Sequence, residues 1–476
     1  MFFSAYFFTL SSNMEGGDFL QMTLEVEDIT HLHFRSMAHI AWIPLGKLVY
    51  GFASFIGYGG GSIKPVEILN IFLAALGSAI FLILIYELTK SLLVSICLTA
   101  FLSFSYALWF EFVHTELYSG SFLFVILSFY LYSKENIKFK TLFIALANSF
   151  ALFFHLTNLG IVLCSVIYYL SGKEKIKEKI KNSSVFILFL TLILLIGYGL
   201  SEMTTSLGYV RAFGQGTTWM LLFQYHLATS FFRGIFINGL VWYIIYLSLF
   251  IFLFIASFKD IFKSRLLYLS LIFGFLLALT IKITAPLSPN FANILVVLSI
   301  ALALMLRGYN RFSLLKKGTV ALVLVFLAAF IFSKNFQLLY DSKDIGKDHI
   351  YQAAIAKPGN LISSSDIVFA NGILPSYLEY YIRCKTYIIY PECNGEYLYQ
   401  VLVNDINSCI YKDRVKLFLD RSEKEIVPAA NILDIDYFLK RLSKDFRLEL
   451  LYETKGGDPL YKDVVLYEVK KSKSEK

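Results

Sequence analysis

Apolar stretches, each about as long as a lipid bilayer is thick, recur along most of this chain and restrict its fold more than any other feature. A spanning helix needs ~20 predominantly apolar residues. Stretches of roughly that size lie at 66–88, 91–110, 117–132, 141–155, 157–170, 185–200, 238–258, 266–283, 291–306 and 318–333. With the apolar N-terminal piece, they predict about eleven transmembrane helices. Hydrophobic residues make up 57% of the chain and charged residues 16%, against about 45–50% and about 25% in soluble proteins, which excludes a single aqueous core.

The loops between these stretches alternate in charge, and this alternation predicts the topology. One set is basic and contains Lys90, Lys134, Lys138, Lys140, the lysines of 173–181, Lys259, Lys263, Arg265, Arg307, Arg311, Lys316 and Lys317. The other set is poor in Lys and Arg and carries Glu15, Asp18, Glu25, Glu27, Asp28, Glu111, Glu116 and Glu202. Because Lys and Arg in short loops mark the cytoplasmic side, we expect the acidic loops to face outward. The net charge of +8 therefore reflects topology and the lipid bilayer as partner, and nucleic acid is not expected to bind.

Residues 1–338 are expected to form the transmembrane domain, with a long first outward loop at 12–58. The first eleven residues lack a basic segment and are too short for a spanning helix. They predict either a first membrane helix truncated by a late start or a short tilted helix. The expected location is the inner (plasma) membrane of a bacterium.

Residues 339–476 have the composition of a soluble domain. A strand at Asp366–Ala370, a helix at Pro375–Ile382 and a strand at Thr386–Tyr390 predict a βαβ unit and a parallel sheet. A helix near 397–408, a strand at Val415–Asp420, a helix at Ile435–Leu442 and strands near 447–452 and 463–469 should follow. The stretch at 318–333 runs outward under this topology, so the α/β domain is expected to be extracytoplasmic. A disulfide between Cys384 and Cys393 would suit an oxidising compartment.

The first outward loop holds most of the groups that could perform chemistry. Glu15 and Asp18 are three residues apart, and a carboxylate at a membrane surface can act as a general base toward an acceptor hydroxyl. His31, His33 and His39 follow and could hold a phosphate. All seven histidines lie in or beside outward segments: His31, His33, His39, His114, His155, His226 and His349. The alternative is a solvated loop with ordinary charges.

Four segments in order resemble a known family. Glu15-Gly-Gly-Asp18-Phe19 resembles the D-x-G-E-F motif of the GT-C glycosyltransferases that use polyprenyl-phosphate sugars, with the two acids exchanged in identity. Ala38–Leu45 resembles A-H-P-P-G-x-P-L and retains His39. Thr115–Tyr118 resembles A-E-V-Y, and Ala151–Asn158 resembles a segment whose histidine matches His155. The closest similarity is to bacterial relatives of the protein O-mannosyltransferases.

The resemblance implies a polytopic, GT-C-like α-helical membrane protein that transfers a sugar from a polyprenyl-phosphate carrier, with inversion, to an extracytoplasmic protein or glycan acceptor. It implies Asp18 or Glu15 as the base. Glu116 and Tyr118 would line the sugar or acceptor pocket. The further candidates for donor or acceptor binding are His31, His33, His39, His155, Arg211, His226 and Lys282. Lys282 is the cation nearest to the place where many relatives have an arginine.

Other readings remain open at the level of sequence. A lipid or glycan transporter or flippase would concentrate ionisable residues near the bilayer midplane, and here the stretches carry almost none. A non-catalytic membrane assembly protein is the third reading. No cofactor is implied, and no residue spacing is diagnostic of a metal, although a divalent cation stays open.

Overall fold

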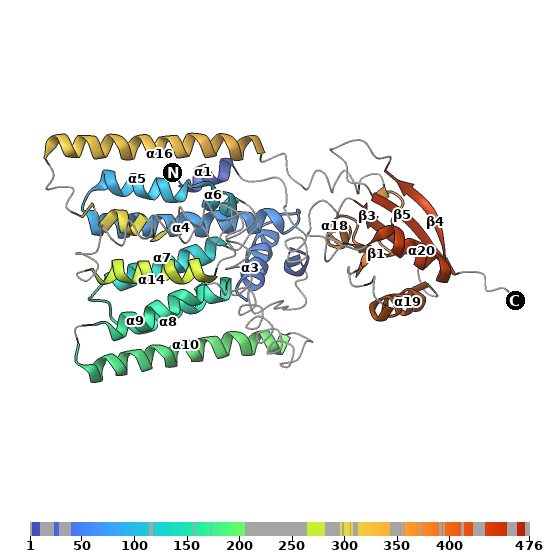
Figure 1. Ribbon diagram of the computed structural model, residues 1–476, viewed down its shortest axis with the longest axis horizontal. Coiled ribbons are helices and arrows are strands. Elements are labelled where there is room, and N and C mark those ends of the chain that lie inside the picture. Colours follow the sequence, from blue (N-terminus) through green and yellow to red (C-terminus); the bar gives the residue numbers. More distant parts are fainter. Residues whose placement is uncertain are drawn as a thin grey trace. The chain divides into compact units, whose positions relative to one another are not determined.

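The structure is a computed structural model. It describes residues 2–9, 23–27, 40–113, 118–155, 158–172, 174–204, 264–280, 296–297, 299–304, 306–307, 313–342, 355, 358–371, 374–389, 393, 396–410, 414–421, 434–454 and 464–471. The chain divides into two compact units: the first comprises Met1–Leu10 and Glu25–Asp341, and the second comprises Ser11–Leu24 and Ser342–Lys476. The first is helical and the second is an α/β unit (Figure 1).

The helical unit is built from apolar helices. Those that the structure describes are α1 (Phe2–Phe8), α3 (Trp42–Phe55), α4 (Ile63–Thr89), α5 (Leu92–Ser103), α6 (Tyr106–Val113), α7 (Tyr118–Ser133), α8 (Lys140–Phe154), α9 (Leu159–Leu170), α10 (Ile176–Thr204), α14 (Arg265–Thr280) and α16 (Leu314–Ser342). Three of these helices contain a segment long and apolar enough to cross a membrane: Ile63–Thr89 in α4, Ile176–Gly197 in α10 and Leu314–Gln337 in α16. Five more described helices are apolar but shorter.

The predicted helical membrane architecture is therefore confirmed, but the predicted count of about eleven spans is not. The stretch predicted at 91–110 is two helices, α5 and α6, separated at Phe104. The stretch at 238–258 lies outside the described residues, and so does much of 291–306. The α8 and α9 helices form a hairpin, because Lys140 at the start of α8 donates a hydrogen bond to the Tyr168 hydroxyl near the end of α9 (2.5 Å).

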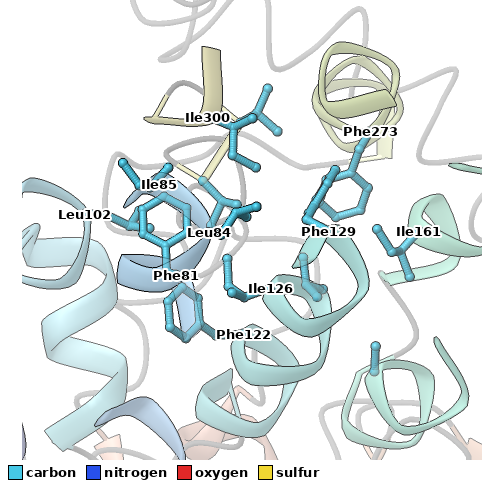
Figure 2. Close-up of a cluster of buried hydrophobic side chains, with 14 of the residues drawn as sticks. Phe81, Leu84, Ile85, Leu102, Phe122, Ile126, Phe129, Ile161, Phe273 and Ile300 are labelled. Carbon is cyan, nitrogen blue, oxygen red and sulfur yellow. The ribbon is translucent and has the colours of Figure 1, made fainter. Parts of the chain in front are cut away.

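The core of the bundle lies where α4 and α7 pack together. Phe81 and Leu84 of α4 lie toward Phe122 and Ile126 of α7, and all four are almost completely buried (Figure 2). Helix α14 joins this core through a ring contact between its Phe273 and Phe129 of α7, whose centroids are 5.6 Å apart. Close packing of such side chains gives van der Waals contact between the helices and holds them in fixed register.

The bundle has two chemically different ends. The described lysines and arginines of the predicted cytoplasmic loops lie at the end where α4, α7 and α9 finish and α8, α10, α14 and α16 begin (Figure 1). We call it the basic end. At the opposite end α4 and α7 begin and α8 finishes. Helix α3 runs across the bundle there instead of along it (Figure 1). Which compartment each end faces stays a prediction from the charge of the loops.

The α/β unit contains a five-stranded sheet in the order β2-β1-β3-β5-β4. Its strands are β1 (Ile367–Asn371), β2 (Lys385–Ile389), β3 (Val415–Asp420), β4 (Phe446–Glu453) and β5 (Val464–Lys471). Its helices are α18 (Leu374–Tyr381), α19 (Glu396–Ile410) and α20 (Ile435–Asp445). The first three strands are parallel, as the βαβ pattern predicts, and β5 and β4 are antiparallel.

The central strands of this sheet are fully buried, as expected for parallel strands covered on both faces. A buried ion pair joins them: Lys416 of β3 contacts Asp366, which immediately precedes β1, at 2.5 Å. All five cysteines are buried, and none of them is in a disulfide. The disulfide that the sequence leaves open among Cys384, Cys393 and Cys409 is not formed in the structure. Each thiol is packed as a small apolar side chain.

Candidate functional site

Tyr118 and His155 meet at the end of the bundle opposite the basic end. The Tyr118 hydroxyl lies 3.3 Å from His155 Nε2, and the two rings are 5.0 Å apart. Tyr118 is the first residue of α7, and His155 is the cap residue that ends α8. The hydroxyl and the imidazole nitrogen can exchange donor and acceptor roles with the tautomer of the histidine. The structure thus brings together two of the site residues predicted from sequence.

A glycine allows α7 and α8 to approach so closely. A Cβ placed on Gly120 would lie 2.3 Å from Phe154 Cε1, well inside van der Waals contact. Phe154 is buried beside His155. Gly120 therefore positions the Tyr118–His155 pair.

Gly120→Ala should destabilise the protein by about 1–3 kcal/mol, because the added methyl group overpacks the contact with Phe154. Gly318 of α16 is a matched control, since a Cβ there meets nothing within 4 Å. Gly318→Ala should be neutral or slightly stabilising through helix propensity. Thermal unfolding of both variants in the same micelles checks the prediction. Equal melting temperatures for the two variants would contradict it.

Asn158 fixes the backbone beside His155. Its side-chain amide donates to the carbonyl oxygens of Ala151 (2.8 Å) and His155 (3.1 Å) and to the Ser121 hydroxyl (2.7 Å). It is completely buried. This positioning role was not anticipated from the sequence, although Asn158 ends the segment that resembles the family motif.

Glu67 is a functional candidate that the sequence analysis missed. It lies near the start of α4, is 1% exposed, and contacts the ammonium group of Lys64 at 2.7 Å. Lys64 is 44% exposed, so the pair joins a buried carboxylate to an accessible cation. The signal in the sequence is a lysine and a glutamate three residues apart at the start of a predicted membrane helix, a spacing that allows an ion pair. The apolar pattern of 66–88 predicts a membrane span and does not distinguish Glu67 from its neighbours.

Further hydrogen bonds tie neighbouring elements to this end. One turn after Glu67, Asn70 of α4 accepts a hydrogen bond from Ser119 of α7. Glu27 of the first outward loop accepts from the Ser62 backbone N–H at 3.0 Å. The Ala41 N–H, just before α3, donates to the Phe153 carbonyl at 3.2 Å. Parts of the predicted first loop therefore reach the ends of α4 and α8.

The pKa of the Tyr58 hydroxyl is raised by burial and by the acidic groups around it. Burial raises the pKa of Tyr58, and the nearby Tyr50, Glu67 and Glu27 raise it further. Tyr58 therefore stays protonated and can donate a hydrogen bond at neutral pH. The end of the bundle around α4 thus combines carboxylates, an ammonium group, hydroxyls, amides and an imidazole. Such groups can hydrogen-bond a polyhydroxylated or phosphorylated ligand.

Most of the predicted site residues lie outside the residues that the structure describes. These are Glu15, Asp18, His31, His33, His39, Glu116, Arg211, His226 and Lys282. Their assignment remains a prediction. Among the described residues, no group of three or more His, Cys, Asp or Glu side chains is placed to hold a metal ion.

The chain matches no protein-family model and no curated protein sequence. Solved structures do match. The crystal structure of ArnT from Cupriavidus metallidurans bound to undecaprenyl phosphate aligns over 97% of this chain and 96% of its own, with a TM-score of 0.59 and 11% sequence identity. The fold resembles that of ArnT.

The same protein in its apo state gives an equivalent match, with a TM-score of 0.59, 11% identity, and coverage of 98% of this chain and 96% of the ArnT chain. The ArnT-like fold supports an integral membrane protein with a helical body and a C-terminal sheet region. At this level of identity the likeness concerns the fold alone.

Proposed function

We propose that the chain is a GT-C glycosyltransferase that moves a sugar from a polyprenyl-phosphate carrier to an extracytoplasmic acceptor. The observation that carries the proposal is the ArnT-like fold over nearly the whole chain. ArnT is a GT-C glycosyltransferase, and undecaprenyl phosphate, the ligand in one ArnT structure, is a polyprenyl phosphate. The sequence motifs independently resemble the same class. The closer relationship to protein O-mannosyltransferases stays a prediction.

In this reaction a carboxylate of Asp18 or Glu15 accepts the proton of the acceptor hydroxyl. The acceptor oxygen attacks the anomeric carbon, the bond between that carbon and the phosphate oxygen breaks, and its electron pair leaves on the polyprenyl phosphate. Attack from the side opposite the leaving group inverts the anomeric configuration. The departing phosphate gains negative charge and needs cationic or hydrogen-bonding support.

Lys64 joins His155 and the other earlier candidates for that support, because Lys64 and His155 both lie at the proposed active end of the bundle. Glu67 holds the Lys64 ammonium group in place. Tyr118, Asn70 and Ser119 carry hydrogen-bonding groups suited to sugar hydroxyls. The histidines and arginine of the outward loops, His31, His39 and Arg211 among them, remain candidates for the phosphate.

The distribution of charge favours an enzyme over a transporter. In α4, the charged residues lie near the two helix ends, with Lys64 and Glu67 at one end and Glu87 at the other. Between α7, α8 and α9 an uncharged hydrogen-bond network links Tyr132, Ser165 and Asn148. Transporters place ionisable groups near the midplane to bind their substrates.

The proposal is tested in membranes that contain the chain and are supplied with labelled polyprenyl-phosphate sugars. Release of polyprenyl phosphate and appearance of label in an acceptor are expected, and membranes without the chain give the background. No transfer from any such donor by the wild-type chain would refute the proposed function.

Glu67→Gln should lower the rate of transfer about tenfold or more, since it replaces the charged partner of Lys64 with a neutral one and weakens a charge-assisted hydrogen bond. Glu87→Gln is the matched control. It removes the same charge from the same helix and breaks the Glu87–Lys134 contact at the basic end. It should leave the rate unchanged. Equal rates in both variants would exclude Glu67 from the site while leaving the function standing.

A further inference from the structure

A second polar cluster lies at the basic end of the bundle, away from the proposed active end. The Arg265 guanidinium group, at the start of α14, lies over the Tyr168 ring with its carbon 3.7 Å from the centroid. The Lys140 ammonium group, at the start of α8, lies 4.8 Å from the same centroid and donates to the Tyr168 hydroxyl. Two cations from different helices therefore converge on one aromatic ring.

This ring is held rigidly. Tyr168 is 9% exposed, and the Tyr132 ring of α7 stacks with it at a centroid distance of 5.0 Å. Tyr132 is anchored in turn by a 2.6 Å hydrogen bond to Ser165. Arg265 is tied to the end of α9 by a hydrogen bond from its Nε to the Ser171 hydroxyl (3.2 Å). The two cations are thus positioned by packed elements and are not free surface side chains.

Within the part of the chain that the structure describes, neither cation forms a direct ion pair with a carboxylate, and the charges of Glu135 and Glu174 act on Lys140 only from a distance. The ion pairs found there involve other residues, including the neighbouring Lys134–Glu87 pair. The Lys140 ammonium group donates to two neutral oxygens, the Tyr168 hydroxyl and the Lys134 carbonyl. Of the three guanidinium nitrogens of Arg265, only Nε donates a hydrogen bond to another described residue, the Ser171 hydroxyl. Two like charges held side by side at a membrane surface favour an anion between them.

We propose that Lys140 and Arg265 form a binding site for the phosphodiester head group of an anionic membrane lipid. A guanidinium fork and an ammonium group are the donors that bind phosphate oxygens, and basic pockets between membrane helices bind lipid head groups in this way. The position at the helix ends places the site at the depth of lipid phosphates. The inference depends on the membrane fold and is independent of the proposed sugar transfer.

The experiment measures lipid retained by the full-length chain. The protein is purified in detergent with equal amounts of phosphatidylglycerol and phosphatidylcholine, and bound lipids are counted by native mass spectrometry. The wild-type chain should retain phosphatidylglycerol in preference to phosphatidylcholine. The Lys140→Met/Arg265→Gln double variant should lose this preference by about tenfold or more, as expected for the loss of two charge-assisted hydrogen bonds.

A matched control removes the same charge from the same end of the bundle. Lys138 and Lys177 are exposed lysines there, so Lys138→Met/Lys177→Gln should keep the wild-type preference. Undiminished retention in the Lys140→Met/Arg265→Gln variant would overturn the proposal, as would equal losses in both double variants.

Two arms on the wild-type chain keep the test decisive even if the variant does not fold. Retention of phosphatidylglycerol should fall as salt concentration rises, because the contact is ionic. Salt-independent retention would overturn the proposal. Inorganic phosphate at millimolar concentration should not displace the lipid. If inorganic phosphate alone raised the melting temperature as much as phosphatidylglycerol does, the site would bind a soluble anion and the lipid proposal would be overturned.

Discussion

Asp18→Asn should reduce sugar transfer by about 10²–10⁴-fold, the contribution of a positioned general base. The amide keeps the size of the side chain but cannot accept the acceptor proton. The measurement is the initial rate of transfer from a labelled polyprenyl-phosphate sugar in membranes, normalised to the amount of chain. Donor binding should be largely preserved, so the loss should fall on kcat.

Glu15→Gln decides between the two acids of the motif. The family motif begins with an aspartate, and that position aligns with Glu15. In this chain the aspartate of the motif is the second acid, Asp18. If Asp18 is the base, Glu15→Gln should have a much smaller effect, and the ratio between the two single variants identifies the base. Full activity in both single variants and in the double variant would remove the first loop from the chemistry.

Asp366→Ala should destabilise the α/β unit by about 3–5 kcal/mol. Its side chain is 1% exposed and that of Lys416 is 7% exposed, so the substitution leaves an unpaired charge in the middle of the sheet. Hydrogen exchange of the β1 and β3 amides in the full chain measures the local free energy of opening. Replacing both partners, as in Asp366→Leu/Lys416→Met, should cost much less because no buried charge remains.

An exposed ion pair in the same sheet provides the control. Lys470 and Glu449 contact each other at 2.6 Å, and each side chain is 46% exposed. Glu449→Ala should cost less than about 1 kcal/mol, because water screens the pair. Similar losses for Asp366→Ala and Glu449→Ala would show that burial does not strengthen the ion pair between the parallel strands.

The same ion pair predicts a dependence of stability on pH. Burial alone would raise the pKa of Asp366, but the hydrogen bond and charge of Lys416 and the backbone hydrogen bond from Ser363 outweigh it and lower the pKa. A group whose pKa is lower in the folded state stabilises that state above its unfolded pKa of about 3.9. This contribution is lost as the pH falls through the folded-state pKa. Asp366→Asn should abolish the corresponding acid-dependent step.

The prediction of the fold succeeded where local pattern decides structure. The strands of the α/β unit alternate with amphipathic helices, and buried runs such as Val415–Asp420 have few alternatives to a central strand. The prediction failed at 91–110, where an uninterrupted apolar stretch is broken at Phe104 into two helices. Periodicity cannot detect such a break, because it follows from the packing of Phe104 against Trp109 and Phe332 of α16.

Buried polar groups are the part of the candidate site that is hardest to predict from sequence. Tyr118 and His155 were singled out because motifs contain them. Glu67, Asn70 and Asn158 lie within or beside apolar stretches and look like ordinary helix residues in a one-dimensional pattern. Their importance follows from neighbours that are distant in sequence, as with Asn70 and Ser119.

The amino-acid sequence by itself determined that the chain is a helical membrane protein with an α/β unit at its C-terminus, because hydrophobic length and periodicity act locally along the chain. Only the tertiary structure decided which polar groups meet. Gly120 lets α7 and α8 approach, and this approach brings Tyr118 to His155. The folding of the α8–α9 hairpin against α14 likewise brings Lys140 and Arg265 to one tyrosine ring. Such contacts depend on the packing of helices far apart in sequence, which no local pattern encodes.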